Sequence, residues 1–318
     1  MSKARIVQIG LGGWGHNHAR VLSEMGVLHA VCDMDDERMS AIKTKHDVPW
    51  GYTKLKDLMD MEKDKFDGAV ITTPSKTHFK IAKQLLEAGK HVFIEKPMTY
   101  DVNEGEELVR IAKENNVTLT CGYIERFNPV VKYVKNVVDT HQYGKLILLE
   151  FHRENRMPIH ISDVGIIYDT SVHDIDTANW LFGCAPKSVY CRAGSLRHQH
   201  EDFACIVLDY GQNKTATIIS NWVTPKKLRT FNAVFTDALI DCNFYTQQIE
   251  VCSDKETIIP NTIKNEPLSE ELKMFIGCIE GTNEPLVKGE DAVLVTKIAE
   301  AALESSKTNK PVLLTTVT

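Results

Sequence analysis

The sequence lacks any apolar run approaching the roughly 20 residues that a membrane-spanning helix requires. Its first residues, MSKARIVQIGLGG, lead directly into a strand pattern. They lack the longer apolar region and the small-residue cleavage site of a signal peptide. We therefore expect a cytoplasmic protein without a membrane segment.

The chain also lacks an excess of positive charge. The 318 residues carry a formal net charge of -6, without the basic excess typical of a nucleic-acid-binding protein. The eight cysteines are scattered without CxxC spacing, and several lie in apolar, strand-like runs. This distribution predicts reduced, buried thiols and argues against a disulfide framework or a zinc site. We expect neither a nucleic-acid partner nor a metal.

The length predicts roughly two domains of ~150 residues each. In the first part of the chain, strand-like apolar runs alternate with segments of helical periodicity. The strand-like runs are residues 4–10, 27–33, 66–74, 90–95 and 117–123, and the helical segments are 18–26, 35–46, 76–89 and 102–116. This alternation is typical of βαβ units. We predict an α/β fold whose N-terminal domain, residues 1–122, is a Rossmann doubly wound parallel sheet.

The first strand-to-helix turn reads GLGGWG and fits the pattern GxGxxG between a strand and a helix. Glycines permit a tight turn and a close approach of the backbone, so that a pyrophosphate can rest on the helix N-terminus. The candidate cofactor-binding residues in this turn are Gly10, Gly12, Gly13, Trp14 and Gly15.

An acidic residue ends the second predicted strand. Asp33 follows Gly10 by 23 residues, where a carboxylate can accept hydrogen bonds from the adenosine ribose. It would repel a 2'-phosphate, and Met34 supplies no arginine to bind one, so NAD is favoured over NADP. Arg38 lies close enough to leave room for both cofactors. The alternative for Asp33 is an N-cap of the following helix.

Two further segments are expected beside the glycine turn, because loops after parallel strands gather at the carboxyl edge of the sheet. One is ITTPSKTH and the other is EKP, which ends an apolar strand. Taken alone, the lysine of EKP would be a solvated residue at a strand exit. The candidate cofactor-binding residues in these segments are Thr72, Thr73, Pro74, His78, Glu95 and Lys96.

Beyond Tyr123 the pattern changes to long strand-like segments, several of which alternate polar and apolar residues. They are residues 144–153, 187–194, 203–211, 214–223, 229–236, 238–244 and 247–253. Helical patterns occupy 166–183, 269–281 and 289–307. An open antiparallel or mixed sheet with one accessible face is expected. We predict a C-terminal α+β domain of residues 123–318.

One predicted helix carries a histidine and a carboxylate at helical spacing. Asp169 and His173 are four residues apart and share a helix face, with Asp176 on the same side. Histidine exchanges a proton near neutral pH, and a carboxylate one turn earlier can fix its tautomer. The alternative is an ordinary surface helix.

The glycine loop, Asp33 and the TTPSKTH, EKP and DTSVHDID segments, in this order, resemble the Gfo/Idh/MocA family of glucose-fructose oxidoreductases and inositol dehydrogenases. The resemblance covers nearly the full chain. It implies an NAD-dependent enzyme that oxidises or reduces a hydroxyl-bearing carbon of a sugar or cyclitol. It also implies catalytic roles for Lys96, Asp169 and His173, which would contact the substrate, and a homodimer or homotetramer.

Within the family, GYIERFNPVV and the run from Arg153 through DVGIIYDTSVHDID to NWVTPKK look most similar to the branch that oxidises the 3-hydroxyl of UDP-N-acetylglucosamine. The sequence departs from this branch at Tyr123, where histidine is frequent. A nucleotide sugar requires a diphosphate site, and guanidinium groups bind phosphate oxygens bidentately. The candidate substrate-binding residues are Tyr123, Arg126, Asn128, Arg153 and Arg156. The alternatives are a dehydrogenase of a free sugar or inositol, and a non-catalytic NAD-binding sensor.

Overall fold

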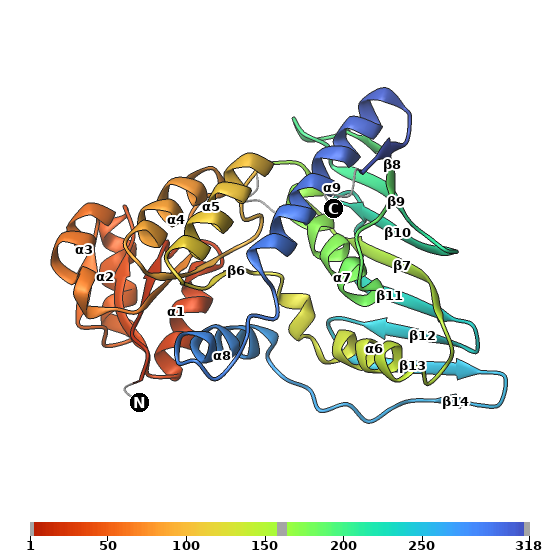
Figure 1. Cartoon of the computed structure of the whole chain (residues 1–318), viewed down its shortest axis with the longest axis horizontal. Coiled ribbons are helices and arrows are strands. Elements are labelled where there is room, and N and C mark those ends of the chain that lie inside the picture. Colours follow the sequence, from red (N-terminus) through yellow and green to blue (C-terminus); the bar gives the residue numbers. More distant parts are fainter. Residues whose placement is uncertain (1–2, 158–163, 315–318) are drawn as a thin grey trace. The chain divides into compact units, whose positions relative to one another are not determined.

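The computed structural model describes residues 3–157 and 164–314, which form two compact units (Figure 1). The first unit comprises Met1–Tyr123 and Leu268–Val293, and the second comprises Ile124–Pro267 and Leu294–Thr318. The sequence predicted a single division between residues 122 and 123. The structure differs because a segment near the C-terminus returns to the first unit.

The returning segment contains helix α8, Pro267–Ile279, whose apolar side chains complete the core of the first unit. The rings of Phe275 and Phe93 lie 5.8 Å apart, a distance typical of packed aromatic side chains. Just beyond the helix, the Glu280 carboxylate accepts a hydrogen bond from the backbone N–H of Ala4 at 3.2 Å. These contacts explain why the helix groups with the first sheet.

The first unit is built on six parallel strands in the order β3-β2-β1-β4-β5-β6, which confirms the predicted doubly wound sheet. The strands are β1 Ile6–Ile9, β2 Leu28–Cys32, β3 Trp50–Tyr52, β4 Gly68–Ile71, β5 His91–Ile94 and β6 Leu119–Cys121. The helices between them are α1 Gly15–Glu24, α2 Asp36–Lys45, α3 Leu55–Glu62, α4 His78–Glu87 and α5 Val102–Glu114. The sequence patterns did not predict β3 and α3, because a three-residue strand gives little periodic signal.

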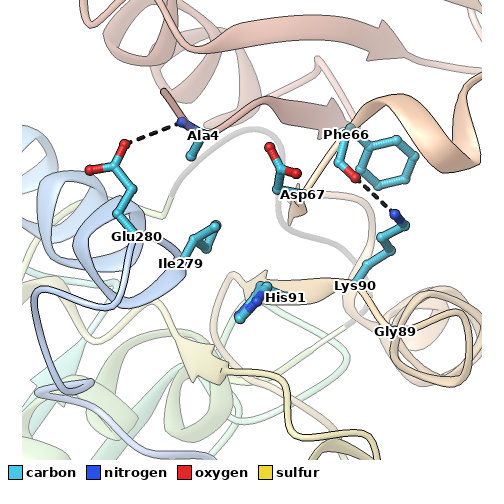
Figure 2. Close-up of a pocket in the computed structure, with 8 residues that line it drawn as sticks. All are labelled: Ala4, Phe66, Asp67, Gly89, Lys90, His91, Ile279 and Glu280. Atoms are coloured by element: carbon cyan, nitrogen blue, oxygen red, sulfur yellow. Dashed lines mark hydrogen bonds between the residues drawn. The ribbon is translucent and has the colours of Figure 1, made fainter. Parts of the chain in front are cut away.

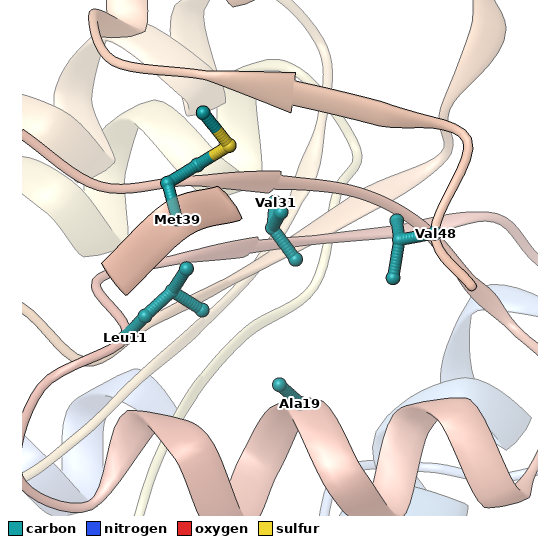
Figure 3. Close-up of a cluster of buried hydrophobic side chains, with 5 residues drawn as sticks. All are labelled: Leu11, Ala19, Val31, Met39 and Val48. Atoms are coloured by element: carbon teal, nitrogen blue, oxygen red, sulfur yellow. The ribbon is translucent and has the colours of Figure 1, made fainter. Parts of the chain in front are cut away.

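A cluster of buried side chains holds α1 and α2 against the sheet (Figure 3). Leu11 from the glycine loop packs with Ala19 of α1, Val31 of β2, Met39 of α2 and Val48. Each large side chain buried in this way stabilises the fold by roughly 1.5–3 kcal/mol. The apolar cluster therefore fixes the glycine loop between its strand and its helix.

A buried carboxylate joins the outer strands of this sheet to α3. Glu62 is only 1% exposed and accepts hydrogen bonds from His29 Nε2 at 2.9 Å, from the Tyr52 hydroxyl at 2.8 Å and from Lys65 Nζ at 3.3 Å. Burial raises the pKa of Glu62, but the three donors outweigh burial and lower it below its ordinary value. The Glu62 carboxylate is therefore stabilised in its ionised form.

The second unit contains a sheet in the order β14-β13-β12-β11-β7-β10-β9-β8-β15. Strands β7 and β10 are parallel and the other pairs are antiparallel, which confirms the predicted mixed sheet. Its strands are β7 Leu146–Glu154, β8 Ser188–Gly194, β9 Phe203–Gly211, β10 Lys214–Asn221, β11 Leu228–Phe235, β12 Ala238–Asn243, β13 Gln248–Ser253, β14 Thr257–Ile258 and β15 Val312–Leu313. Buried and more exposed side chains alternate along β9, as expected for a sheet covered on one face.

Helices α6, Pro129–Thr140, and α7, Val172–Phe182, pack on this sheet (Figure 1). The last helix of the chain is α9, Gly289–Thr308. Helix α6 was not predicted from the sequence, although Asn128 and the following proline form an ordinary helix start. None of the helices in residues 3–157 and 164–314 has the length and apolar character that crossing a bilayer requires.

Candidate functional site

The glycine loop packs tightly against the end of β4. Gly10 has a φ of +86°, and a Cβ there would lie 2.8 Å from the backbone of Thr72. A Cβ on Gly15 would lie 2.3 Å from the Gly10 carbonyl oxygen and 2.5 Å from the Thr72 hydroxyl oxygen. The Thr72 hydroxyl donates to the Gly10 carbonyl at 2.6 Å. Side chains are therefore excluded from both glycine positions, and Thr72 braces the loop.

The backbone N–H groups at the start of α1 are not capped by the side chain at the N-cap position. Trp14, at the N-cap position, makes no capping hydrogen bond, and no acidic residue lies in the first turn. A Cβ on Gly13 would meet no atom within 4 Å, so the space beside this residue is open. An uncapped helix start beside open backbone suits an anion such as a pyrophosphate.

Asp33 lies at the end of β2 and faces the glycine loop. Its carboxylate accepts hydrogen bonds from the backbone N–H groups of Leu11 at 2.6 Å and Asp35 at 2.9 Å, and Arg38 Nη1 lies 3.3 Å away. The N-cap of α2 is Asp35, whose side chain accepts from the Arg38 N–H, so the alternative capping role for Asp33 is wrong. Arg38 Nη1 also lies 3.2 Å from the position of a Cβ on Gly12. Together, these groups fit the adenosine ribose and the pyrophosphate of NAD.

His78 differs from its predicted role as a direct cofactor contact. The side chain is 1% exposed, with Nε2 2.8 Å from the Thr73 carbonyl oxygen and Nδ1 2.9 Å from the Pro97 carbonyl oxygen. Burial lowers the pKa of His78, and a neutral imidazole can donate to only one of these two oxygens. His78 thus bridges the loops after β4 and β5. Pro74, in contrast, is exposed.

A buried histidine that was not among the predicted site residues holds Glu95. His18 is fully buried on α1, and its Nε2 lies 2.8 Å from Glu95 Oε1. Glu95 Oε2 accepts the backbone N–H of Lys96 at 3.0 Å, and a Cβ on Gly122 would lie 3.0 Å from this carboxyl group. The helical spacing of His18 and the buried Leu22 was the available signal. Glu95 and the backbone of Lys96 are therefore fixed from two sides, and the Lys96 side chain is partly exposed.

Asp169 and His173 stand out in the second unit by their exposure. Between residues 165 and 179, these two are partly exposed and every other residue is buried. The Thr170 hydroxyl donates to Asp169 Oδ2 at 3.0 Å. The predicted continuous α-helix is wrong here, because Ile167–Ser171 is a π-helical turn that leads into α7. Such turns are frequent at functional sites.

Arg153 does not present its guanidinium to a ligand, in contrast to the prediction. It is 2% exposed and binds Asp174 with Nε at 3.0 Å and Nη2 at 2.7 Å, while Nη1 donates to Glu125 at 3.1 Å. Burial lowers the pKa of Arg153, but the two carboxylates outweigh this effect and raise it above its ordinary value. Arg153 is therefore a structural cation that anchors α7 one residue after His173.

Three other predicted substrate contacts are also buried. Arg126 binds Asp176 bidentately, with Nε at 2.8 Å and Nη2 at 2.6 Å. Asn128 caps α6 by accepting the Val130 N–H, and Tyr123 is 1% exposed. Because their polar groups or rings lie inside the protein, these residues do not form the predicted diphosphate site. The remaining candidate, Arg156, is exposed, and its Nη1 lies 3.5 Å from the Val223 carbonyl oxygen.

A hollow of about 350 Å³ lies at the opposite, amino edge of the first sheet (Figure 2). Within it, Lys90 Nζ donates to the Phe66 carbonyl at 2.8 Å, and Asp67 accepts the N–H of Arg5 at 2.8 Å. These charged groups form hydrogen bonds with backbone atoms. The hollow and the glycine loop lie at opposite ends of the strands. Its lining residues are Ala4, Phe66, Asp67, Gly89, Lys90, His91, Ile279 and Glu280.

Comparison with known proteins gives matches along most of the chain. A model described as the oxidoreductase family, NAD-binding Rossmann fold, matches residues 4–123, and a model of the GFO/IDH/MocA C-terminal domain matches residues 131–258. UDP-N-acetylglucosamine 3-dehydrogenase of Acidithiobacillus ferrooxidans is 24% identical, covering 93% of this chain and 94% of its own. scyllo-Inositol 2-dehydrogenase (NAD(+)) of Bacillus subtilis is 26% identical, covering 98% of this chain and 96% of its own. An oxidoreductase from Agrobacterium radiobacter, solved with NAD+, L-tartaric acid and magnesium, shares the fold with a TM-score of 0.90 at 17% identity and covers 98% of both chains.

Proposed function

Because the chain belongs to the Gfo/Idh/MocA family of NAD-dependent oxidoreductases, we propose that it oxidises the 3-hydroxyl of UDP-N-acetylglucosamine to a 3-keto nucleotide sugar. The observation that carries the proposal is the exposure of Asp169 and His173 in an otherwise buried run. Support for the substrate comes from the relative that is named for this reaction and matches over nearly the full chain.

The proposed chemistry separates hydride transfer from proton transfer. When bound, NAD accepts a hydride from the carbon that carries the hydroxyl group. His173 acts as the general base that takes the hydroxyl proton, and Asp169 orients its imidazole. The ammonium of Lys96 donates a hydrogen bond to the oxygen as negative charge develops. The products are the ketone, NADH and one proton.

A second possible mechanism exchanges the proton-transfer roles of Lys96 and His173. Here the neutral amine of Lys96 takes the proton and His173 relays it onward. Both assignments require the first unit to supply Lys96 and the second unit to supply His173. They also require Glu95 to keep the Lys96 backbone in place, as its hydrogen bond at 3.0 Å indicates.

The substrate is tested by mixing the protein and NAD with UDP-N-acetylglucosamine, other UDP-sugars, free sugars and inositols, and recording NADH absorbance. We expect kcat/KM to be highest for UDP-N-acetylglucosamine. Preference for an inositol would favour the alternative, which the likeness to scyllo-inositol 2-dehydrogenase supports. If NAD binds and no panel member is oxidised, the proposal of a sugar dehydrogenase fails and the sensor alternative stands.

We also propose that the protein forms a homodimer or homotetramer through the mixed sheet of the second unit. The face of this sheet turned away from α6 and α7 presents large apolar side chains, among them Tyr190, Phe203 and Leu239, each 36–38% exposed. A second copy of the sheet could cover these apolar side chains, which are spread over strands β8, β9 and β12. Light scattering of the purified protein measures the mass, and a monomer at micromolar concentration would refute this arrangement.

A further inference from the structure

Two cations lie against one aromatic ring at the start of β11. Lys227 Nζ is 4.4 Å from the centre of the Tyr245 ring, and Arg229 Cζ is 4.7 Å from it. Lys227 directly precedes β11 and Arg229 is the second residue of this strand, and both side chains lie against the same ring. Tyr245 itself is 43% exposed. The cluster therefore presents positive charge at the surface of the second unit.

The guanidinium of Arg229 is only partly satisfied by the protein. Among residues 3–157 and 164–314, its buried Nε has no hydrogen-bond acceptor. The nearest carboxylate oxygen is Glu125 Oε1, 3.7 Å from Nη1, and Glu125 already accepts hydrogen bonds from Arg153 and Asn128. Burial, together with the charge of Arg153, lowers the pKa of Arg229. A partly desolvated guanidinium of this kind is well suited to bind an external anion bidentately.

The loop that carries Tyr245 is held in place before any ligand arrives. The Asn243 side chain accepts the backbone N–H groups of Tyr245 at 3.0 Å and Thr246 at 2.9 Å. The Phe244 N–H donates to the Arg229 carbonyl at 3.0 Å. Because the aromatic ring and the strand are tied together, the cations lose little further freedom on binding an anion.

The cluster is connected to the candidate catalytic helix through buried charges. Arg229 pairs with Glu125, which also pairs with Arg153. Arg153 in turn pairs with Asp174, the residue that directly follows His173 in the chain. All of these residues belong to the second unit. The cation cluster and His173 are therefore linked by ion pairs within one unit.

We infer that Arg229 and Lys227, supported by the Tyr245 ring, bind the diphosphate of a nucleotide-sugar substrate. This inference rests on the proposed function for the identity of the ligand. Arg229 and Lys227 take the place of the phosphate contacts predicted at Arg126 and Arg153, whose guanidinium groups are buried against carboxylates. Two phosphate groups offer enough oxygen atoms to engage the guanidinium fork and the ammonium together.

The test compares wild type with Arg229→Gln, Arg229→Lys and Lys227→Gln in the full chain with NAD. Lys255→Gln removes an exposed cation of the same unit and is the matched control. Calorimetry measures the binding of UDP, uridine and inorganic pyrophosphate, and NADH formation gives kcat and KM for UDP-N-acetylglucosamine. Thermal unfolding checks that each variant is folded.

We expect Arg229→Gln to weaken UDP and pyrophosphate binding and to raise KM by about tenfold or more, because a hydrogen-bonded charge pair is lost. In the same variant, the affinity for uridine and kcat should each change by less than about threefold. Arg229→Lys should recover part of the loss, since it restores the charge without the fork. Lys227→Gln should shift the same quantities in the same direction, and it carries the test if Arg229→Gln does not fold.

Two outcomes separate this inference from the proposed function. If wild type oxidises UDP-N-acetylglucosamine and the Arg229 and Lys227 variants match the Lys255 control, the anion site is refuted and the function stands. If wild type binds UDP and pyrophosphate through Arg229 but oxidises no UDP-sugar, the function is refuted and the anion site stands.

Discussion

Replacing Arg153 with methionine removes the cation between Asp174 and Glu125 while keeping a long apolar side chain. In the structure, the side chains of Arg153 and Asp174 are 3% and 1% exposed, and the pair is bidentate. The substitution leaves Asp174 buried without its counter-charge. Removing one partner of a buried ion pair costs about 3–5 kcal/mol, so we expect the free energy of unfolding to fall by this amount at neutral pH.

The pH dependence of stability and a second substitution both test whether the loss of stability comes from the unpaired charge of Asp174. Burial raises the pKa of Asp174, and Arg153 opposes this rise, so removing Arg153 raises the pKa further. The folded variant then takes up a proton more readily than the unfolded chain as the pH falls, and part of its lost stability returns in mild acid. Adding Asp174→Leu removes the unpaired charge, so the double variant should be more stable than Arg153→Met alone.

Urea unfolding followed by circular dichroism, together with UDP titration of the folded protein, measures both effects. The structural role predicts a lower urea midpoint and partial rescue by Asp174→Leu. An unchanged midpoint combined with lost UDP affinity would refute the reasoning, because Arg153 would then be the phosphate contact that the sequence predicted.

Four other substitutions test the catalytic assignment, the glycine loop and the buried carboxylate of Glu62. Lys96→Ala and His173→Ala should each lower kcat at least about tenfold with NAD affinity nearly intact, as measured by NADH formation and cofactor titration; wild-type turnover in both would remove the catalytic assignment. Gly15→Ala places a Cβ 2.3 Å from a loop carbonyl oxygen and should abolish NAD binding in a calorimetric titration, whereas unchanged affinity would show that the loop adapts. Glu62→Gln should be less stable than wild type, with a difference that is largest at neutral pH and disappears in acid below the ordinary pKa of a glutamate. The reason is that the lowered pKa of Glu62 makes its stabilisation fade as the pH falls, and a pH-independent difference in urea midpoints would contradict this.

Local patterns in the sequence were sufficient to predict the Rossmann sheet, the NAD cofactor and the family, and all three are confirmed. Apolar strands alternating with helices specify a parallel sheet, and the glycine turn with Asp33 specifies its cofactor edge. These features depend on residues that are close in the sequence or on a fixed topology. The spacing of Asp169 and His173 singled out these two residues, and their catalytic roles stay a prediction.

Long-range pairing was not visible in the sequence. Arg126 and Arg153 looked like phosphate ligands, because nothing local shows that Asp176 and Asp174 neutralise them across 50 and 21 residues. The amphipathic pattern of α8 indicates a buried face without indicating which sheet covers it. The role of His18 was missed for the same reason, since its partner Glu95 is 77 residues away.

The most direct test of the central claim is a crystal structure of the protein with NAD and UDP-N-acetylglucosamine. The account predicts that Lys96 Nζ and the His173 imidazole both lie about 3 Å from the 3-hydroxyl oxygen, beside the nicotinamide ring. A bound sugar whose 3-hydroxyl contacts neither group, or a complex with the two groups on opposite sides of the protein, would contradict it.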